Sequence, residues 1–230
     1  MKRIFAITAC AFVLPGVALA ATRTYQTGTF EKVSIAEGIA ADITMGPTRS
    51  VVAETKSDSF DDLRVSVKDN VLQIDRPARS WFSFGQRPSY QVHVNTPALH
   101  SLTASSGAEV KVNGALEGDF SVAASSGSDV HVSQVKGGSV ALSTSSGSDI
   151  SIAGSCVSLE AQASSGSDLD ADDLKCENVS LQASSGSDVS VAASKNVTGH
   201  ASSGSDVRVR GKSPVVQVDR SSGAHLVVKE

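Results

Sequence analysis

The chain has 230 residues, a formal net charge of −4, 40% hydrophobic residues and only 4% aromatic ones. No Phe, Tyr or Trp follows Phe120, which argues against a conventional core that buries aromatic rings. Of the 39 serines, 31 lie at or after Ser101, yet valines and leucines recur among them, which argues against a disordered serine-rich tail. The mild acidity gives no reason to expect nucleic acid as a partner.

Residues 1–20 have the features of a secretory signal peptide. Lys2 and Arg3 provide the positive start, and a nearly continuous apolar stretch leads to a small-residue cleavage site after Ala20. A lipoprotein signal ending at Cys10 is the alternative, but too few apolar residues precede Cys10 for an apolar region of about 7–15 residues. No later apolar run is long enough to span a bilayer. We therefore expect an exported protein that is not transmembrane and resides in the periplasm or outside the cell at its surface.

The main signal is a Ser-Ser-Gly motif that occurs seven times, at steps of 18 to 20 residues. Five copies continue as Ser-Ser-Gly-Ser-Asp. The seven turn glycines are Gly107, Gly127, Gly147, Gly166, Gly186, Gly204 and Gly223. Apolar residues alternate with polar ones on both sides of each copy, as Val130 and Val132 do after the second. A period of two over short segments is typical of strands with one buried face.

Two strands in each coil of 18–20 residues, repeated in register, predict an all-β fold, a β-helix or solenoid. Successive coils then pair about 4.8 Å apart, and a narrow interior needs only aliphatic and small side chains. A β-sandwich also has many short strands, but it does not require the same turn sequence in every repeat. We therefore expect one β-helix over residues 21–230, with irregular N-terminal coils over 21–100 and seven regular coils over 101–230.

The two cysteines that follow the signal peptide occupy equivalent positions in the repeat. Cys156 and Cys176 each stand ten residues before a turn glycine. Cα atoms stacked about 4.8 Å apart fall within the usual disulfide range of about 4.4–6.8 Å. An exported protein also meets an oxidising compartment. We expect a disulfide that closes one coil, and the alternative is two buried thiols that face each other.

A further position of the repeat forms a row of mostly acidic residues. Its occupants are Glu109, Asp129, Asp149, Asp168, Asp188, Asp206 and His225. Stacked carboxylates repel each other, and a bound cation would offset that repulsion. The five aspartates are therefore weak candidates for binding a divalent cation such as Ca²⁺, which takes six to eight oxygen ligands. Turn chemistry, in which each Asp or Ser bonds a nearby backbone N–H, is the simpler explanation. We favour it and expect no metal or other cofactor.

The rest of the repeated turn has its own interpretation. We expect the two serines before each glycine to form hydroxyl ladders from coil to coil. The glycine in the third position indicates a corner with positive φ or a close approach of two backbones.

Residues 76–89 depart from the repeat, because prolines near both ends and Gly85 mark a loop. Trp and Arg are enriched in binding hot spots, and this loop gathers both. Its candidate binding residues are Arg79, Trp81, Phe82, Phe84 and Arg87. The alternatives are that the aromatic rings fold back over the rod or contact a membrane surface.

The repeated turn and two early stretches resemble a known family. The stretches are Phe30-Glu31-Lys32-Val33-Ser34-Ile35 and Val71-Leu72-Gln73-Ile74. They are similar to the head GIN domain family of bacterial auto-transporter adhesins, and the resemblance covers residues 28–228. It implies a right-handed single-stranded β-helix. The family has no assigned biochemical function and brings no catalytic residues to carry over.

We find no constellation that indicates an enzyme. The histidines are scattered, and the Ser-Ser-Gly copies lack the flanking glycines of a nucleophile elbow. A polysaccharide-cleaving β-helix is the less favoured alternative, because the sequence shows no acidic and basic cluster for a groove. We expect a non-enzymatic, adhesin-like binding protein that presents a polar repeat surface to a glycan, an envelope polymer or a protein. The rival is a structural envelope protein that self-associates end to end, because an open coil end exposes unpaired backbone groups.

Overall fold

The computed structural model describes residues 20–57, 59–77, 87–211 and 215–229, and every regular element within them is a β-strand. The predicted signal peptide lies outside these residues except for Ala20. The strands are β1 (Ala21–Tyr25), β2 (Lys32–Ile35), β3 (Ala40–Met45), β4 (Ser50–Thr55), β5 (Arg64–Lys68), β6 (Val71–Asp75), β7 (Tyr90–Thr96), β8 (Ser101–Ala104), β9 (Glu109–Asn113), β10 (Leu116–Glu117), β11 (Phe120–Ser125), β12 (Asp129–Ser145), β13 (Asp149–Ser164), β14 (Asp168–Ala183), β15 (Asp188–Ala201), β16 (Asp206–Arg210), β17 (Val215–Arg220) and β18 (His225–Lys229).

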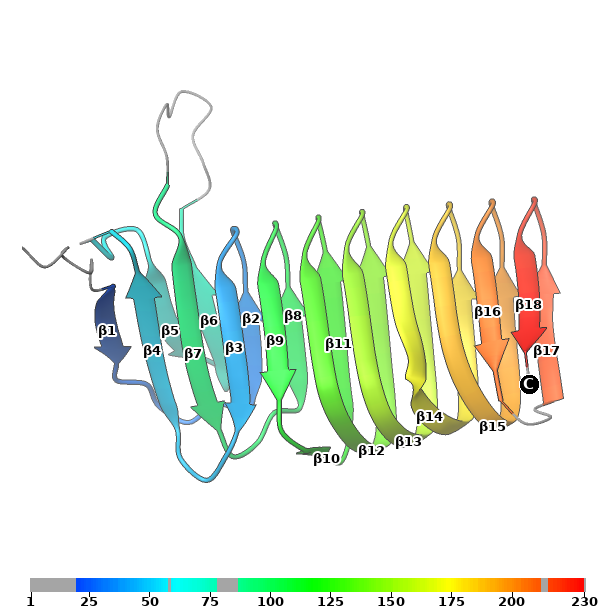
Figure 1. Ribbon diagram of the computed structural model, residues 1–230, viewed down its shortest axis with the longest axis horizontal. Helices are drawn as coiled ribbons and strands as arrows, with labels where there is room; N and C mark the ends of the chain where they lie inside the picture. The colour runs from blue at the N-terminus through cyan, green and yellow to red at the C-terminus, as the bar shows by residue number, and fades with distance from the viewer. Residues whose placement is uncertain (1–19, 58, 78–86, 212–214, 230) are drawn as a thin grey trace, which may run out of the picture.

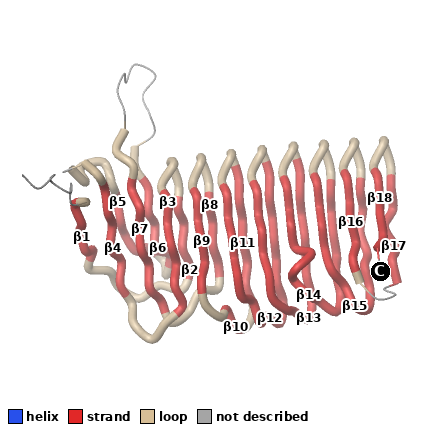
Figure 2. The backbone as a smooth tube through the Cα atoms, in the orientation of Figure 1, coloured by secondary structure: helices blue, strands red, loops and turns tan. Residues whose placement is uncertain are grey.

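The strands wind into a flattened rod, so the predicted all-β solenoid is confirmed (Figure 1). Each regular coil has one strand before a tight turn and one after it, and neighbouring coils pair in parallel. The tight turns line up along one long edge of the rod (Figure 2). Along the other edge β12 to β15 pass from one face to the other without a break, with register shifts where they bend.

Inward-facing aliphatic side chains fill the interior. Along β12, Val130, Val132, Val140 and Leu142 are each at most 3% exposed, and outward-facing neighbours alternate with them. Gly154 shows how closely the backbones approach at the bent edge. It has φ +139°, and a Cβ there would lie 2.2 Å from the carbonyl oxygen of Val135 in the preceding coil. Only glycine fits this position, because any other residue would overlap the neighbouring backbone.

Each tight turn is a corner made of two residues with positive φ. In the first repeat these are Ser106 at 53° and Gly107 at 73°, and the other repeats have similar values. The sequence analysis expected this conformation only for the glycine. The Gly107 N–H donates to the carbonyl of Ser126 in the next coil at 3.0 Å, and this bond recurs along the rod. Glu37 and Gly38 form an eighth corner with φ values of 63° and 66°, although no Ser-Ser-Gly motif marks it.

In the five Ser-Ser-Gly-Ser-Asp copies the serine after the glycine points into the core. Ser148 is fully buried, and its hydroxyl lies 2.9 Å from the carbonyl oxygen of Ala124 in the preceding coil. The same hydroxyl accepts the N–H of Ser145 at 3.2 Å within its own turn. Equivalent bonds to the preceding coil are made by Ser128, Ser167, Ser187 and Ser205. The hydroxyls that join coils at this corner therefore belong to the serine after the glycine, not to the two serines before it as expected.

The strands of the N-terminal part do not stack in chain order. The coil of β2 and β3 lies between the coil of β6 and β7 and the coil of β8 and β9 (Figure 1). Beyond β7 the pairing becomes antiparallel, first to β4 and then to β1, and β5 pairs antiparallel with β6. Asp69 and Asn70 connect β5 to β6 with φ values of 52° and 64°, as a two-residue hairpin turn requires. The irregular part is thus a cap that reverses direction, whereas the sequence analysis expected coils in succession.

The predicted disulfide is present. Cys156 on β13 and Cys176 on β14 are register partners, with Cα atoms 4.5 Å apart and a bond between their sulfurs. Both residues are buried at the bent edge of the rod. The bridge therefore links two consecutive coils across a closed loop of 20 residues.

Candidate binding surface

The two faces of the rod carry different side chains. The strands after each turn present the charged face, whose outward residues are Glu109, Lys111, Asp129, His131, Asp149, Asp168, Asp170, Asp188, Asp206 and Arg208. The strands before each turn present what we call the hydroxyl–amide face. From β8 to β15 its outward residues are Ser101, Thr103, Ser121, Ala123, Ser139, Ala141, Ser143, Ser158, Glu160, Gln162, Asn178, Ser180, Gln182, Asn196, Thr198 and His200. Glu160 is the single carboxylate among these, and β17 continues the face with Val215, Gln217 and Asp219.

The acidic row lies on the charged face beside the turns. Asp129, Asp149 and Asp168 are register partners in successive coils, and the row extends from Glu109 to His225. Partial burial and the carboxylate of Asp129 both raise the pKa of Asp149. Within the described residues no group of three or more His, Cys, Asp or Glu is arranged to hold a metal ion. We therefore base no site on the five aspartates.

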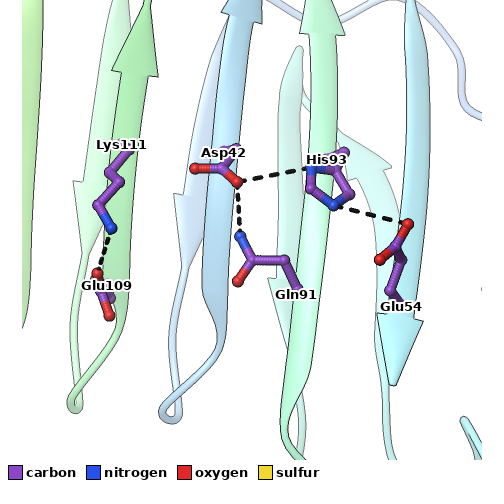
Figure 3. A network of polar contacts seen from close by, with 6 residues as sticks. All are labelled: Asp42, Glu54, Gln91, His93, Glu109 and Lys111. Carbon is purple, nitrogen blue, oxygen red and sulfur yellow. Dashed lines mark hydrogen bonds and ion pairs between the residues drawn. The ribbon is translucent and has the colours of Figure 1, made fainter. Parts of the chain in front are cut away.

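A second polar network lies within the N-terminal part, across β3, β7 and β4 (Figure 3). His93 on β7 lies between two carboxylates, with Nδ1 3.7 Å from Asp42 on β3 and Nε2 3.9 Å from Glu54 on β4. The amide of Gln91 donates to the same Asp42 carboxylate at 2.9 Å. These contacts cross one parallel and one antiparallel strand pair, so they hold the reversed strand β4 against the rod.

Four of the five candidate binding residues belong to the part of the loop that the structure does not describe. Arg79, Trp81, Phe82 and Phe84 lie outside the described residues, and their role stays a prediction. Arg87 is described, and its guanidinium donates to the carbonyl of Pro77.

Arg76 was not singled out in the sequence, yet it joins the start of this segment to the rod. Its Nε donates to the carbonyl of Glu37 at 2.7 Å, and its Nη1 donates to the carbonyl of Pro88 at 2.8 Å. Its guanidinium carbon also lies 5.7 Å from the centre of the Tyr90 ring. The two ends of segment 76–89 are thus tied to the corner between β2 and β3.

A hollow lies on the hydroxyl–amide face. It is a groove of about 1020 Å³ that crosses β11, β12, β13, β14 and β15. Hydroxyl and amide side chains from successive coils line it, namely Ser121, Ser139, Ser158, Ser180, Thr198, Asn178 and Asn196, and apolar residues, namely Phe120, Val140, Ala141, Leu159 and Val179, lie between them. Two smaller hollows, of about 260 and 210 Å³, adjoin it on the same face.

Two pairs of groove side chains bond from one coil to the next. Ser158 donates to the hydroxyl of Ser139 at 3.1 Å, and the amide of Asn196 donates to the amide oxygen of Asn178 at 2.8 Å. Asp119 at one end of the groove accepts the N–H of Ser139 at 2.8 Å. These bonds restrain four of the groove side chains, and hydroxyl or amide groups recur along the groove at one step per coil.

This groove was not predicted from the sequence. The available signal was the small hydroxyl and amide residues at alternate positions before each turn. The residues that line the groove come from five successive coils, and a pattern along the chain does not show which of them meet at one hollow.

Together these observations define a β-solenoid with two chemically distinct polar faces. Residues 29–213 match the family described as "Putative auto-transporter adhesin, head GIN domain", so the chain belongs to that family, as the sequence resemblance indicated. No curated protein matches the chain significantly. Within the part of the chain that the structure describes, no helix has the length and apolar character to cross a membrane.

Solved structures of bacterial proteins share the fold. A "putative adhesin" from Bacteroides fragilis NCTC 9343 has a TM-score of 0.81 at 13% identity, over 92% of this chain and 97% of its own. A "putative lipid binding protein" from Parabacteroides distasonis ATCC 8503 has a TM-score of 0.70 at 12% identity, over 94% and 98%. A "putative adhesin" from Parabacteroides merdae ATCC 43184 has a TM-score of 0.70 at 14% identity, over 94% and 98%. Identities this low show a common fold alone.

Proposed function

We propose that this chain is an exported, non-enzymatic binding protein that holds a partner of the cell envelope or cell surface in the groove of its hydroxyl–amide face. The groove is the observation that carries the proposal, because it is large, crosses five coils and presents hydroxyl and amide groups from each of them. Membership of an adhesin family supports a binding role. The charged residues lie mainly on the other face, which leaves this face open to a partner selected by hydrogen bonds.

Two substitutions on one strand test this proposal. Ser158→Arg places a long side chain in the groove, whereas Ser151→Arg places the same side chain on the opposite face of β13. We expect Ser158→Arg to weaken binding of the mature protein to isolated envelopes of the source bacterium by roughly tenfold or more. Ser151→Arg should bind as the unmodified protein does. Equal binding by both variants, with unchanged melting curves, would place the partner elsewhere.

Export is a separate part of the proposal and has its own test. N-terminal sequencing of protein recovered from the periplasm or the cell surface should begin at Ala21. A protein found only in the cytoplasm, with Met1 or Lys2 retained, would contradict it, and a lipid-modified Cys10 would identify the lipoprotein alternative.

A further inference from the structure

We infer that the groove takes an uncharged polysaccharide that lies along the axis of the rod. This inference rests on the proposed function and names the class of partner. It follows from three properties of the groove: its charge, its hydrogen-bonding groups and its direction.

The charge of the groove favours a neutral partner. No Lys or Arg is among the described residues that line it, so a polyanion would find no counter-charge there. Its two carboxylates, Asp119 and Glu160, would repel a polyanion. Asp119 is already engaged by the backbone of Ser139, and a cationic partner would be drawn instead to the acidic row on the other face.

The hydrogen-bonding groups match a ligand that both donates and accepts. A serine or threonine hydroxyl carries one donor and two lone pairs, and an asparagine amide carries two donors and an accepting oxygen. The bond between Asn196 and Asn178 uses one of the four N–H groups of the pair, and the bond between Ser158 and Ser139 leaves the Ser139 hydrogen available. Sugar hydroxyls have the same dual character, so each coil can exchange hydrogen bonds with such a ligand.

A protein partner fits the groove less well. The cores of protein interfaces are enriched in aromatic residues and Met, and binding hot spots are enriched in Trp, Tyr and Arg. The one aromatic residue lining this groove is Phe120, which is 3% exposed. The exposed large hydrophobic residues of the described chain, Val157, Val215, Val227 and Val228, are not among the groove residues.

The direction of the groove sets how the ligand lies. The groove crosses five strands of successive coils, from β11 to β15. At about 4.8 Å per coil these strands span roughly 19 Å along the rod. Each coil offers weak contacts, so affinity should grow with the number of coils that one chain engages. A short sugar should therefore bind weakly, and a chain that spans the whole groove should bind best.

The first experiment uses isolated envelopes treated in two ways. Mild periodate cleaves the diols of sugars, and proteinase K removes exposed protein. We expect groove-dependent binding, defined as the binding that Ser158→Arg loses, to disappear after periodate and to survive proteinase K. This groove-dependent binding should also change less than about twofold between low and high salt, because salt screens interactions between charges and leaves hydrogen bonds between uncharged groups unaffected. Groove-dependent binding that proteinase K abolishes would overturn the inference, whereas binding that survives both treatments would indicate a sugar without vicinal diols, such as 1,4-linked N-acetylglucosamine.

The second experiment uses calorimetry with maltose and N-acetylglucosamine oligomers of increasing length. For a series that binds, the dissociation constant should fall with length and level off once the oligomer spans roughly 19 Å. The pair Asn178→Ala and Asn196→Ala should weaken that binding by roughly tenfold, while Ser190→Ala on the opposite face of β15 should not change it. Tighter binding of the polyanion polygalacturonate than of either neutral series would contradict the inference.

The outcomes separate the inference from the proposed function. Envelope binding that depends on Ser158 but is abolished by proteinase K would leave the proposed function standing and remove the polysaccharide. Envelope binding that does not depend on Ser158 would remove both.

Discussion

The hydroxyl of Ser148 lies 2.9 Å from the carbonyl oxygen of Ala124, one coil away, and both atoms are buried. The contact recurs in five coils, so a polar group repeats through an otherwise apolar interior. Burial is tolerated because the hydroxyl satisfies a carbonyl of the preceding coil and an N–H of its own turn.

Removing this hydroxyl should destabilise the rod. Ser148→Ala leaves the carbonyl of Ala124 and the N–H of Ser145 without this partner, which should lower the free energy of unfolding by about 1–3 kcal/mol. Ser143→Ala is the matched control on the strand that leads into this turn, β12, because Ser143 is exposed, and it should change stability by less than about 0.5 kcal/mol. Denaturant titration measures both, and equal effects of the two variants would refute the role of the buried hydroxyl.

The disulfide should contribute measurably to stability. Replacing Cys156 and Cys176 together by alanine should lower the free energy of unfolding by about 3 kcal/mol, because the bridge closes a loop of 20 residues. Dithiothreitol should destabilise the unmodified protein by a similar amount and leave the double variant unchanged. Two free thiols in non-reduced protein would contradict the bridge.

The glycines of the rod should respond to substitution according to what surrounds them. A Cβ at Gly199 would lie 2.0 Å from the carbonyl oxygen of Leu181, so Gly199→Ala forces two coils apart and should cost about 3 kcal/mol. A Cβ at the corner glycine Gly166 meets nothing within 4 Å, and Gly166→Ala should cost only about 1–2 kcal/mol for its φ of +64°. Thermal melts of the two variants compare them directly. A smaller loss in Gly199→Ala would contradict the close approach.

The acidic row should make stability depend on pH. The pKa of Asp149 is raised above its ordinary value of 3.8 by burial and by Asp129, so the folded chain holds this proton to a higher pH than the unfolded chain does. The stabilisation that protonated Asp149 provides is therefore fully present below pH 3.8, the ordinary pKa of Asp. It is lost as the pH rises through the higher pKa of the folded chain. Asp149→Asn should raise the melting temperature at pH 7 and reduce its change between pH 7 and pH 4. The gain should be at most about 0.8 kcal/mol per neighbouring carboxylate before salt screening.

Asp206→Asn provides the control for this prediction. Asp206 has an acidic neighbour on one side and His225 on the other, so its replacement should have a smaller effect at pH 7. A melting temperature that falls in Asp149→Asn would show that the carboxylate is stabilising where it lies.

The regular part of the fold can be predicted from the sequence because several independent patterns indicate it. Alternation at Val130 and Val132 identifies a strand, the repeated Ser-Ser-Gly identifies the corner, and the equal spacing of Cys156 and Cys176 identifies the bridge. The order in which the N-terminal strands stack cannot be predicted from the sequence in this way. A period of two indicates which face of β2 is buried, but it does not say whether β6 or β8 is the neighbour, and β2 pairs with both.

Two further features also escape prediction from the sequence, for physical reasons. A serine such as Ser148 is expected at the surface, and it is buried only because the corner supplies partners that the sequence does not display. The groove is formed by residues of five successive coils, to which no single residue points.

The repeated corner has a consequence for how such a rod can vary. From β11 to β16 the strands of each coil pair mainly with those of the coils on either side, and every corner has the same backbone conformation. Duplication of one complete repeat would therefore insert a coil that already fits both neighbours. The molecule would grow by about 4.8 Å, and each face would gain one more row of the same side chains. Length is thus a property that gene duplication can adjust in whole steps, without redesign of the interior.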